Sequence, residues 1–298
     1  MGTDRAALPA GVRLFRQLPS ILVESIFWDA RTAEVAWLDI TAGTFHRARL
    51  DGAVDGSDDR VVRLPPPASA VQPARGGGFV AALKDRVVLL DADGALVREV
   101  ARTPHAHGGI RNNEGKVDPF GRFVVGAMHV TGDAPDAALY AIDVDGGVEV
   151  LRGGFGVANG FEWSPAGDVM YVTDTSTSTV YRGAYRDGPE PLGDLEPFLT
   201  GLNSDGLARG SGGEFWNGVY GGGEVVRWNA DGTLAERHPL PAPQVTSVAF
   251  GGPDLATLFV GTARENLTEA QLADHPLSGS IFVLDVDAVG APPHVFGG

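Results

Sequence analysis

The chain has 298 residues, of which 43% are hydrophobic and 20% charged, as is ordinary for a folded globular protein. Its net charge of −15 disfavours nucleic acid and membranes as partners, and the absence of cysteine excludes disulfides, thiolate metal sites and cysteine nucleophiles. Residues 1–9 lack the apolar core of a secretory signal, and no stretch approaches the ~20 apolar residues of a membrane span, so we expect a cytoplasmic protein.

Asp-Gly dipeptides at 51–52, 93–94, 145–146, 187–188 and 231–232 recur along the chain at intervals of 42 to 52 residues. Between apolar runs this dipeptide favours a hairpin, because glycine accepts the positive φ that the turn requires. A repeat of about 40–50 residues with several short strands is typical of a four-stranded propeller blade. The predicted fold class is therefore all-β, a six-bladed β-propeller. Residues 1–298 are expected to form one domain, in which residues 1–15 are an N-terminal extension or first strand.

The first predicted blade begins with the apolar run 21–28, which contains Glu24. This glutamate is either an edge residue or part of a site. The second blade contains a glycine turn at 76–78 and a strand from Phe79. His105 and His107 follow, and two histidines at this spacing face the same side of a strand. They indicate either metal ligands or a polar loop.

The segment 111–128 is dense in polar residues and then becomes a strand. If it is extended, Arg111 and Asn113 share one face and point at a common ligand. A guanidinium and an amide are suited to holding hydroxyl and carbonyl oxygens. The tetrapeptide 118–121, Asp-Pro-Phe-Gly, predicts a β-turn.

Asn159 is expected in a turn directly before a strand, and Asp205 occupies the corresponding place in a later repeat. Both are followed by glycine and then by a large apolar residue. Polar residues at the same place in successive blades would point into one central channel, although Asn-Gly and Asp-Gly are also ordinary turn sequences. Residues 266–274 predict a short helix or turn in the last blade.

These stretches together resemble the SMP-30/gluconolactonase/regucalcin-like family of six-bladed propeller lactonases. Any one of them is a weak signal, but their order and spacing over nearly the whole chain are specific. The stretches that carry the resemblance are 24–29 with 37–40, 111–122, 159–165, 204–207 and 250–255.

The resemblance implies that Glu24, Asn159 and Asp205 hold one divalent cation in the central channel. Two carboxylates and one amide suit a hard cation. We expect Ca²⁺ first, with Zn²⁺, Mn²⁺ and Mg²⁺ as alternatives. The cation would polarise a lactone carbonyl while water attacks, and Asp205 would orient or deprotonate that water.

The resemblance also implies that Arg111 and Asn113 contact the substrate, with Glu114 beside them. The chain departs from the family pattern at two places. Glu114 stands where aspartate is usual, and His129-Val130-Thr131 stands where some members carry acidic residues. Both departures bear on which substrate is accepted.

The expected activity is hydrolysis of a sugar lactone by a protein that is a monomer or a weak homo-oligomer. A phosphoester hydrolase of the organophosphate type and a non-catalytic calcium-binding propeller are the alternatives. Retention of Arg111 and Asn113 favours an enzyme, because a structural ion needs no substrate clamp. The chain lacks the Gly-x-Ser-x-Gly motif of many serine hydrolases.

Overall fold

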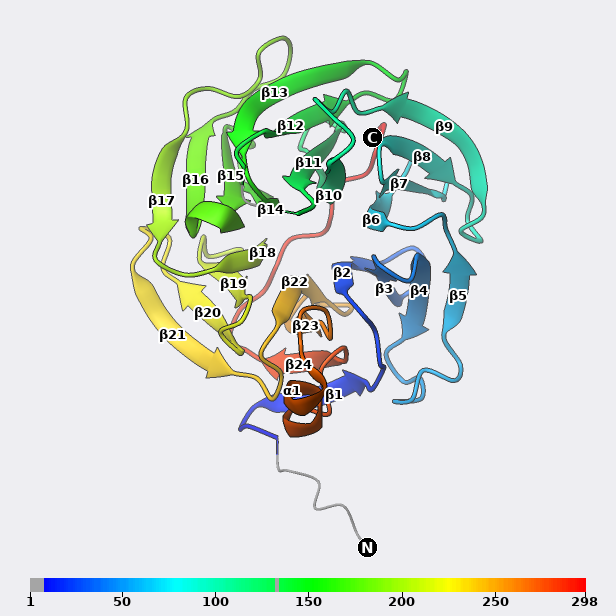
Figure 1. Ribbon diagram of the computed structural model, residues 1–298, viewed down its shortest axis with the longest axis vertical. Coiled ribbons are helices and arrows are strands. Elements are labelled where there is room, and N and C mark those ends of the chain that lie inside the picture. The colour runs from blue at the N-terminus through cyan, green and yellow to red at the C-terminus, as the bar shows by residue number, and fades with distance from the viewer. Residues whose placement is uncertain (1–7, 132–133) are drawn as a thin grey trace, which may run out of the picture.

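The computed structural model describes residues 8–131 and 134–298, which form six four-stranded sheets arranged in a ring (Figure 1). In the first five sheets the strands follow one another in the chain from the centre of the ring to its rim. We number the sheets as blades 1 to 6 in chain order. The predicted all-β, six-bladed propeller is thereby confirmed.

From blade 1 to blade 6, the inner strands are β2 (Val23–Asp29), β6 (Ala68–Pro73), β10 (Ile110–Val117), β14 (Ala158–Trp163), β18 (Ser204–Arg209) and β22 (Val245–Gly251). The second strands are β3 (Glu34–Asp39), β7 (Phe79–Leu83), β11 (Phe123–His129), β15 (Val169–Asp174), β19 (Phe215–Val219) and β23 (Thr257–Thr262). The third strands are β4 (Thr44–Arg49), β8 (Arg86–Leu90), β12 (Ala137–Ile142), β16 (Thr179–Ala184), β20 (Glu224–Trp228) and β24 (Ile281–Asp285). The outer strands are β5 (Arg60–Arg63), β9 (Leu96–Arg102), β13 (Val148–Phe155), β17 (Glu196–Thr200), β21 (Leu234–Pro239) and β1 (Val12–Arg16). The helices are η1 (Thr175–Thr177) and α1 (Glu269–Asp274).

Burial decreases from the centre of each blade to its rim. Every residue of β2 and β6 is buried, whereas β5 and β21 are largely exposed. Strands covered on both faces read as nearly continuous apolar runs, which is why the inner strands dominate the sequence pattern. The core lies between adjacent blades. For example, Phe123 of blade 3 belongs to the same apolar cluster as Phe161 and Trp163 of blade 4.

Blade 6 is completed by the first strand of the chain. β1 pairs antiparallel with β24, so that Val12 lies opposite Leu284. Of the predicted N-terminal segment 1–15, residues 1–7 lie outside the described residues and the remainder leads into β1. This closure also explains why the repeated Asp-Gly dipeptides at 51–52, 93–94, 145–146, 187–188 and 231–232 are five in number, since each lies between the third and fourth strands of one of blades 1 to 5. In blade 6 those two strands are not consecutive in the chain.

A β-bulge interrupts the pairing near the start of all six inner strands in the described residues. The register shifts lie at Glu24/Phe27, Ala68/Ala70, Asn112/Glu114, Asn159/Phe161, Ser204/Leu207 and Val245/Val248. A bulge leaves an extra residue unpaired and turns its side chain away from the regular alternation. The predicted site residues therefore stand where the backbone can aim them toward the centre of the ring.

The expectation that Asn159 lies in a turn is wrong, because it is the second residue of β14. The glycine after it serves close packing instead. A Cβ on Gly160 would lie 2.5 Å from the carbonyl oxygen of Asp205, and one on Gly206 would lie 2.7 Å from that of Thr246. Only glycine lets neighbouring inner strands approach so closely. The Asn-Gly and Asp-Gly pairs thus mark contacts between blades.

The two ends of the ring differ. We call the end at which the inner strands begin the upper face and the opposite end the lower face. The C-terminal segment, red in Figure 1, crosses the ring and pairs with turns on the lower face, where Gly290 bridges Gly210 and Phe296 bridges Ala74. The expected helix in 266–274 is present as α1, on the upper face, with Thr268 and Gln271 forming a capping box. Within the described residues, no helix is long and apolar enough to cross a membrane.

Candidate metal centre

Glu24, Asn159 and Asp205 are each the second residue of an inner strand, in β2, β14 and β18. Equivalent positions in blades of one ring lie at the same height, so all three belong to the upper face. Their exposed fractions are 7%, 6% and 5%, respectively. The structure thus brings the three predicted ligands to one buried region.

The carboxyl groups in this region repel one another. Burial raises the pKa of Glu24 well above its usual value, and the charges of Asp205 and Glu114 raise it further. Burial also raises the pKa of Asp205 to about 8, with added contributions from Glu114 and Glu265. Glu114 has its pKa raised to about 7, again chiefly by burial. A cation among these groups would stabilise their ionised forms.

A chain of hydrogen bonds fixes the orientation of the Asn159 amide. Asn159 Nδ2 donates to Thr175 Oγ1 at 2.8 Å, and the Thr175 hydroxyl donates to the carbonyl oxygen of Ser204 at 2.7 Å. Because the threonine hydrogen is committed to Ser204, its oxygen must accept from Asn159. Asn159 Oδ1 therefore points the other way, where it accepts from Asn113 Nδ2 at 2.8 Å. One lone pair of Oδ1 remains for a further partner.

The residues present fit a hard divalent cation. Among the described residues, Glu24 Oε2 is a buried oxygen without a hydrogen-bond partner. Such an atom carries a desolvation cost unless a cation or proton compensates it. The donors offered by Glu24, Asn159 and Asp205 are all oxygens, as Ca²⁺ and Mg²⁺ require.

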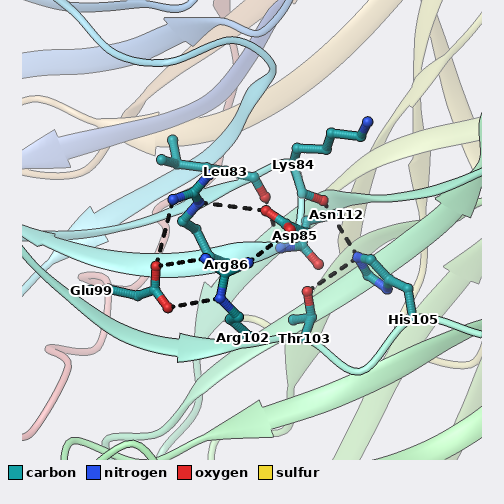
Figure 2. Close-up of polar contacts among 9 residues, drawn as sticks. All are labelled: Leu83, Lys84, Asp85, Arg86, Glu99, Arg102, Thr103, His105 and Asn112. Carbon is teal, nitrogen blue, oxygen red and sulfur yellow. Dashed lines mark hydrogen bonds and ion pairs between the residues drawn. The ribbon is translucent and has the colours of Figure 1, made fainter. Parts of the chain in front are cut away.

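Arg111 and Asn113 lie next to these residues and contact each other. Arg111 Nη1 donates to Asn113 Oδ1 at 2.8 Å, so the two side chains do share a face. Asn112, between them, turns the opposite way and donates from Nδ2 to the carbonyl oxygen of Leu83 at 2.8 Å (Figure 2). Burial lowers the pKa of Arg111, and the charges of Glu265 and Glu24 raise it by a smaller amount.

The sequence analysis missed three residues of the upper face, which are Thr175, Tyr220 and Glu265. Thr175 orients Asn159, as described above, and the charge of Glu265 acts on both Asp205 and Arg111. The hydroxyl of Tyr220 accepts from Asn266 Nδ2 at 2.9 Å. Burial raises the pKa of Tyr220 to about 12, and the charges of Asp205, Glu265 and Glu24 act in the same direction. All three lie in connections between strands, whose sequences lack the repeated context that marks the inner strands.

His105 and His107 do not act as a pair. Nε2 of His105 lies 3.1 Å from Thr103 Oγ1 and 3.4 Å from the carbonyl oxygen of Lys84 (Figure 2). Its Nδ1 lies 3.2 Å from the hydroxyl of Tyr140. These contacts match a histidine of a polar loop. His107 instead contacts Asp136, with 2.9 Å between Nε2 and Oδ2.

A cavity of about 610 Å³ lies on the lower face, away from the predicted ligands. Its lining includes Trp28, Trp163 and, from the C-terminal segment, His294. Trp28 and Trp163 stand at the far ends of β2 and β14 from Glu24 and Asn159. This cavity is therefore separate from the predicted cation ligands.

Comparisons with known proteins agree with the fold. Residues 22–264 match the model of the family described as SMP-30/Gluconolactonase/LRE-like region. The chain is 35% identical over 285 residues to a 6-deoxy-6-sulfogluconolactonase of Pseudomonas putida, covering 94% of this chain and 96% of the relative. It is 33% identical over 280 residues to a pentonolactonase of Haloferax volcanii, covering 91% and 93%.

A crystal structure described as a calcium-binding protein, regucalcin, from Agrobacterium tumefaciens is similar along its whole length. The TM-score is 0.88 at 27% sequence identity, and the match covers 97% of both chains. The family model spans well over half of the chain, from just before Glu24 to just before Glu265. The chain therefore belongs to the SMP-30/gluconolactonase/LRE-like family.

Proposed function

We propose that this protein hydrolyses a sugar lactone with the help of one divalent cation. The observation that carries the proposal is the direct hydrogen bond between Asn113 and Asn159, which joins the expected substrate clamp to the expected cation ligands. The names of the two lactonases at 35% and 33% identity support the same reaction class.

Glu24, Asn159 and Asp205 would hold the cation, with water and substrate completing its coordination. A cation bound there supplies positive charge that polarises the carbonyl of the lactone. We propose Ca²⁺ as the resident ion. Support comes from the all-oxygen donor set and from the calcium-binding description of the solved relative.

Asp205 is the proposed general base. Its carboxylate accepts a proton from a water molecule as the water oxygen forms a bond to the carbonyl carbon. The bond between that carbon and the ring oxygen then breaks, and the ring oxygen takes the proton from Asp205. The product is the open hydroxy acid. A cation bound beside Asp205 would favour the ionised form of this carboxyl, which is the form that accepts the proton.

Arg111 and Asn113 would position the sugar. Arg111 uses Nη1 on Asn113 and on the carbonyl oxygen of Asn112, which leaves its other donors for hydroxyl groups of the substrate. Glu114, whose side chain accepts from the Gly115 N–H at 2.7 Å, is the proposed third contact. Holding the lactone against the base in one orientation lowers the entropic part of the barrier.

The charge of the upper face favours a neutral lactone over an anionic phosphoester. Four carboxyl groups, from Glu24, Glu114, Asp205 and Glu265, act on this region, together with the positive charges of Arg111 and Lys116. The excess of carboxyl groups over basic groups disfavours a phosphoester dianion relative to a neutral lactone.

The test is lactone hydrolysis followed by pH-stat on metal-stripped protein, with Ca²⁺, Mg²⁺, Mn²⁺ and Zn²⁺ restored one at a time. Asp205→Asn is compared with Asp194→Asn, which changes a fully exposed carboxylate. We expect activity that requires a cation, is lost in Asp205→Asn and is unchanged in Asp194→Asn. Cation binding without turnover of any aldonolactone would overturn the proposal, and turnover of phosphoesters instead would support the alternative hydrolase.

A further inference from the structure

Two histidines and an aspartate meet on the upper face of blade 3, outside the residues used so far. His107 precedes β10, His129 ends β11, and Asp136 stands directly before β12. His107 Nε2 lies 2.9 Å from Asp136 Oδ2, and the two imidazole rings are 5.7 Å apart between centroids. One ligand atom from each of the three residues lies within 4.8 Å of the others. We propose that these side chains form a second cation site that takes a transition metal such as Zn²⁺.

The backbone holds the two histidines in place. His129 is paired with Ile110, the first residue of β10, and the Val130 N–H donates to the carbonyl oxygen of Gly109 at 2.9 Å. The His129 N–H donates to the carbonyl oxygen of Gly156, in the connection to blade 4, at 3.0 Å. The end of β11 is thus fixed against the segment that carries His107. His129 is positioned by sheet pairing, and His107 by the turn in which its carbonyl oxygen accepts from the Ile110 N–H at 3.3 Å. We therefore expect side-chain adjustment to suffice to enclose an ion.

The donor set distinguishes this site from the central one. Imidazole nitrogens suit Zn²⁺ and neighbouring transition metals, whereas Ca²⁺ takes oxygen ligands. The chain has no cysteine, so histidine nitrogens are its strongest ligands for such metals. Two imidazoles and one carboxylate leave a fourth position of a tetrahedral site for water. We therefore expect Zn²⁺ to bind here and Ca²⁺ to bind only at the central centre.

Proton accounting shows what the ion must displace. His107 Nδ1 accepts the Gly109 N–H at 3.1 Å, so the ring hydrogen lies on Nε2 and is shared with Asp136. A cation at Nε2 takes the place of that hydrogen, which moves to Nδ1. The Gly109 N–H then loses its acceptor on the ring and donates to water instead. His129 Nδ1 accepts the Thr131 N–H at 3.3 Å and undergoes the same exchange. The side chains of His107 and Asp136 are 46% and 34% exposed, so water replaces the lost contacts at small cost.

The experiment is isothermal titration of untagged, metal-stripped protein with Zn²⁺ and, separately, with Ca²⁺. All variants carry Asp205→Ala, which removes a ligand of the proposed central cation site, so that only ions bound elsewhere are counted. In this background, His129→Ala is compared with His105→Ala, whose ring contacts Thr103 and Tyr140 and takes no part in the proposed site. Zinc content after gel filtration gives an independent measure of stoichiometry.

We expect Asp205→Ala to bind one Zn²⁺ and no Ca²⁺. Adding His129→Ala should weaken zinc binding at least about tenfold. Loss of a residue that only supports a metal ligand already weakens binding by about 10- to 100-fold, and His129 is proposed as a ligand itself. Adding His105→Ala should leave it unchanged. Retention of the zinc in His129→Ala, or its loss in His105→Ala, would overturn the proposal. Zinc binding is measured without lactone turnover. Failure of the proposed lactonase activity would appear in the pH-stat assay and not in this titration.

Discussion

The side-chain amide of Asn113 donates to the side-chain oxygen of Asn159 at 2.8 Å, across the boundary between blades 3 and 4. The same Asn113 accepts from Arg111, while Asn159 is oriented by Thr175. The proposed substrate clamp and the proposed cation ligand are consequently parts of one hydrogen-bonded unit. A substitution in the proposed clamp is therefore expected to change cation affinity as well as kcat/KM.

Replacing Asn113 with leucine tests this coupling. The variant keeps the volume but removes the donor to Asn159 and the acceptor for Arg111. We expect kcat/KM for the lactone to fall about 10- to 100-fold, the usual range when a partner that orients a metal ligand is lost, together with weaker cation affinity. Steady-state kinetics at several Ca²⁺ concentrations measure both. Asn229→Leu, at an exposed amide, is the control, and an unchanged cation affinity in Asn113→Leu would show that the two parts act separately.

Removal of the cation is expected to lower stability. Glu24, Glu114 and Asp205 are then left together without a compensating charge. A ligand present at 100 times its dissociation constant stabilises the folded state by about 2.7 kcal/mol. Thermal unfolding with and without Ca²⁺ should show this as a rise in Tm. The rise should disappear in Asp205→Asn and persist in Asp194→Asn.

Gly160→Ala is predicted to destabilise the fold. The added Cβ would lie 2.5 Å from the carbonyl oxygen of Asp205, so that the inner strands β14 and β18 must move apart. Overpacking of this kind costs about 1–3 kcal/mol. Gly153→Ala in β13 is the matched control, since a Cβ there meets nothing within 4 Å. Chemical denaturation of both variants measures the difference, and equal stabilities would contradict the close approach of the two strands.

Stability is predicted to fall on mild acidification because of His46. Burial lowers the pKa of this imidazole to about 4, and its ring stacks on Trp37. In the unfolded chain it titrates near 6.5, so between pH 6.5 and 4 the unfolded state binds the proton first. The contribution is complete above pH 6.5 and is lost as the pH falls toward 4, on the order of 3 kcal/mol.

Urea unfolding at pH 7 and at pH 4.5 measures this loss. His46→Gln removes the titrating group, and we expect its stability to change less between the two pH values than that of the unchanged protein. His275→Gln serves as the control, because His275 is a surface residue at the end of α1. If His46→Gln and the unchanged protein lose equal stability on acidification, His46 is not the group responsible.

The family and the ring of six blades could be predicted because their signals are local and repeated. The five regularly spaced Asp-Gly dipeptides mark the same hairpin in successive blades, and the polar segment from Arg111 to Arg122 is contiguous in the chain. The approximate place of Asn159 and Asp205 followed from their matching contexts. The roles of Glu24, Asn159, Asp205, Arg111, Asn113 and Glu114 remain predictions, as do the cytoplasmic location and the oligomeric state.

What the sequence did not reveal depends on contacts between distant segments. Gly160 looks like a turn residue until Asp205 of the next blade is placed against it. Thr175 and Tyr220 stand in connections without repeated context, and their partners come from other blades or loops. His107 was paired in sequence with His105, whereas its partner in space, His129, lies 22 residues along the chain at the end of β11.

The pairing of β1 with β24 has a consequence for how the molecule is made. Arg13 Nη2 contacts Asp285 Oδ1 across 272 positions of the chain. During synthesis the first strand therefore waits, without its partner, until nearly every other strand has left the ribosome. Bringing together segments so far apart carries a large entropic cost, so we expect this closure to be the last and slowest event of folding. Until it happens, β24 presents an open edge to any other strand, and newly made chains are most prone to associate with one another during that interval.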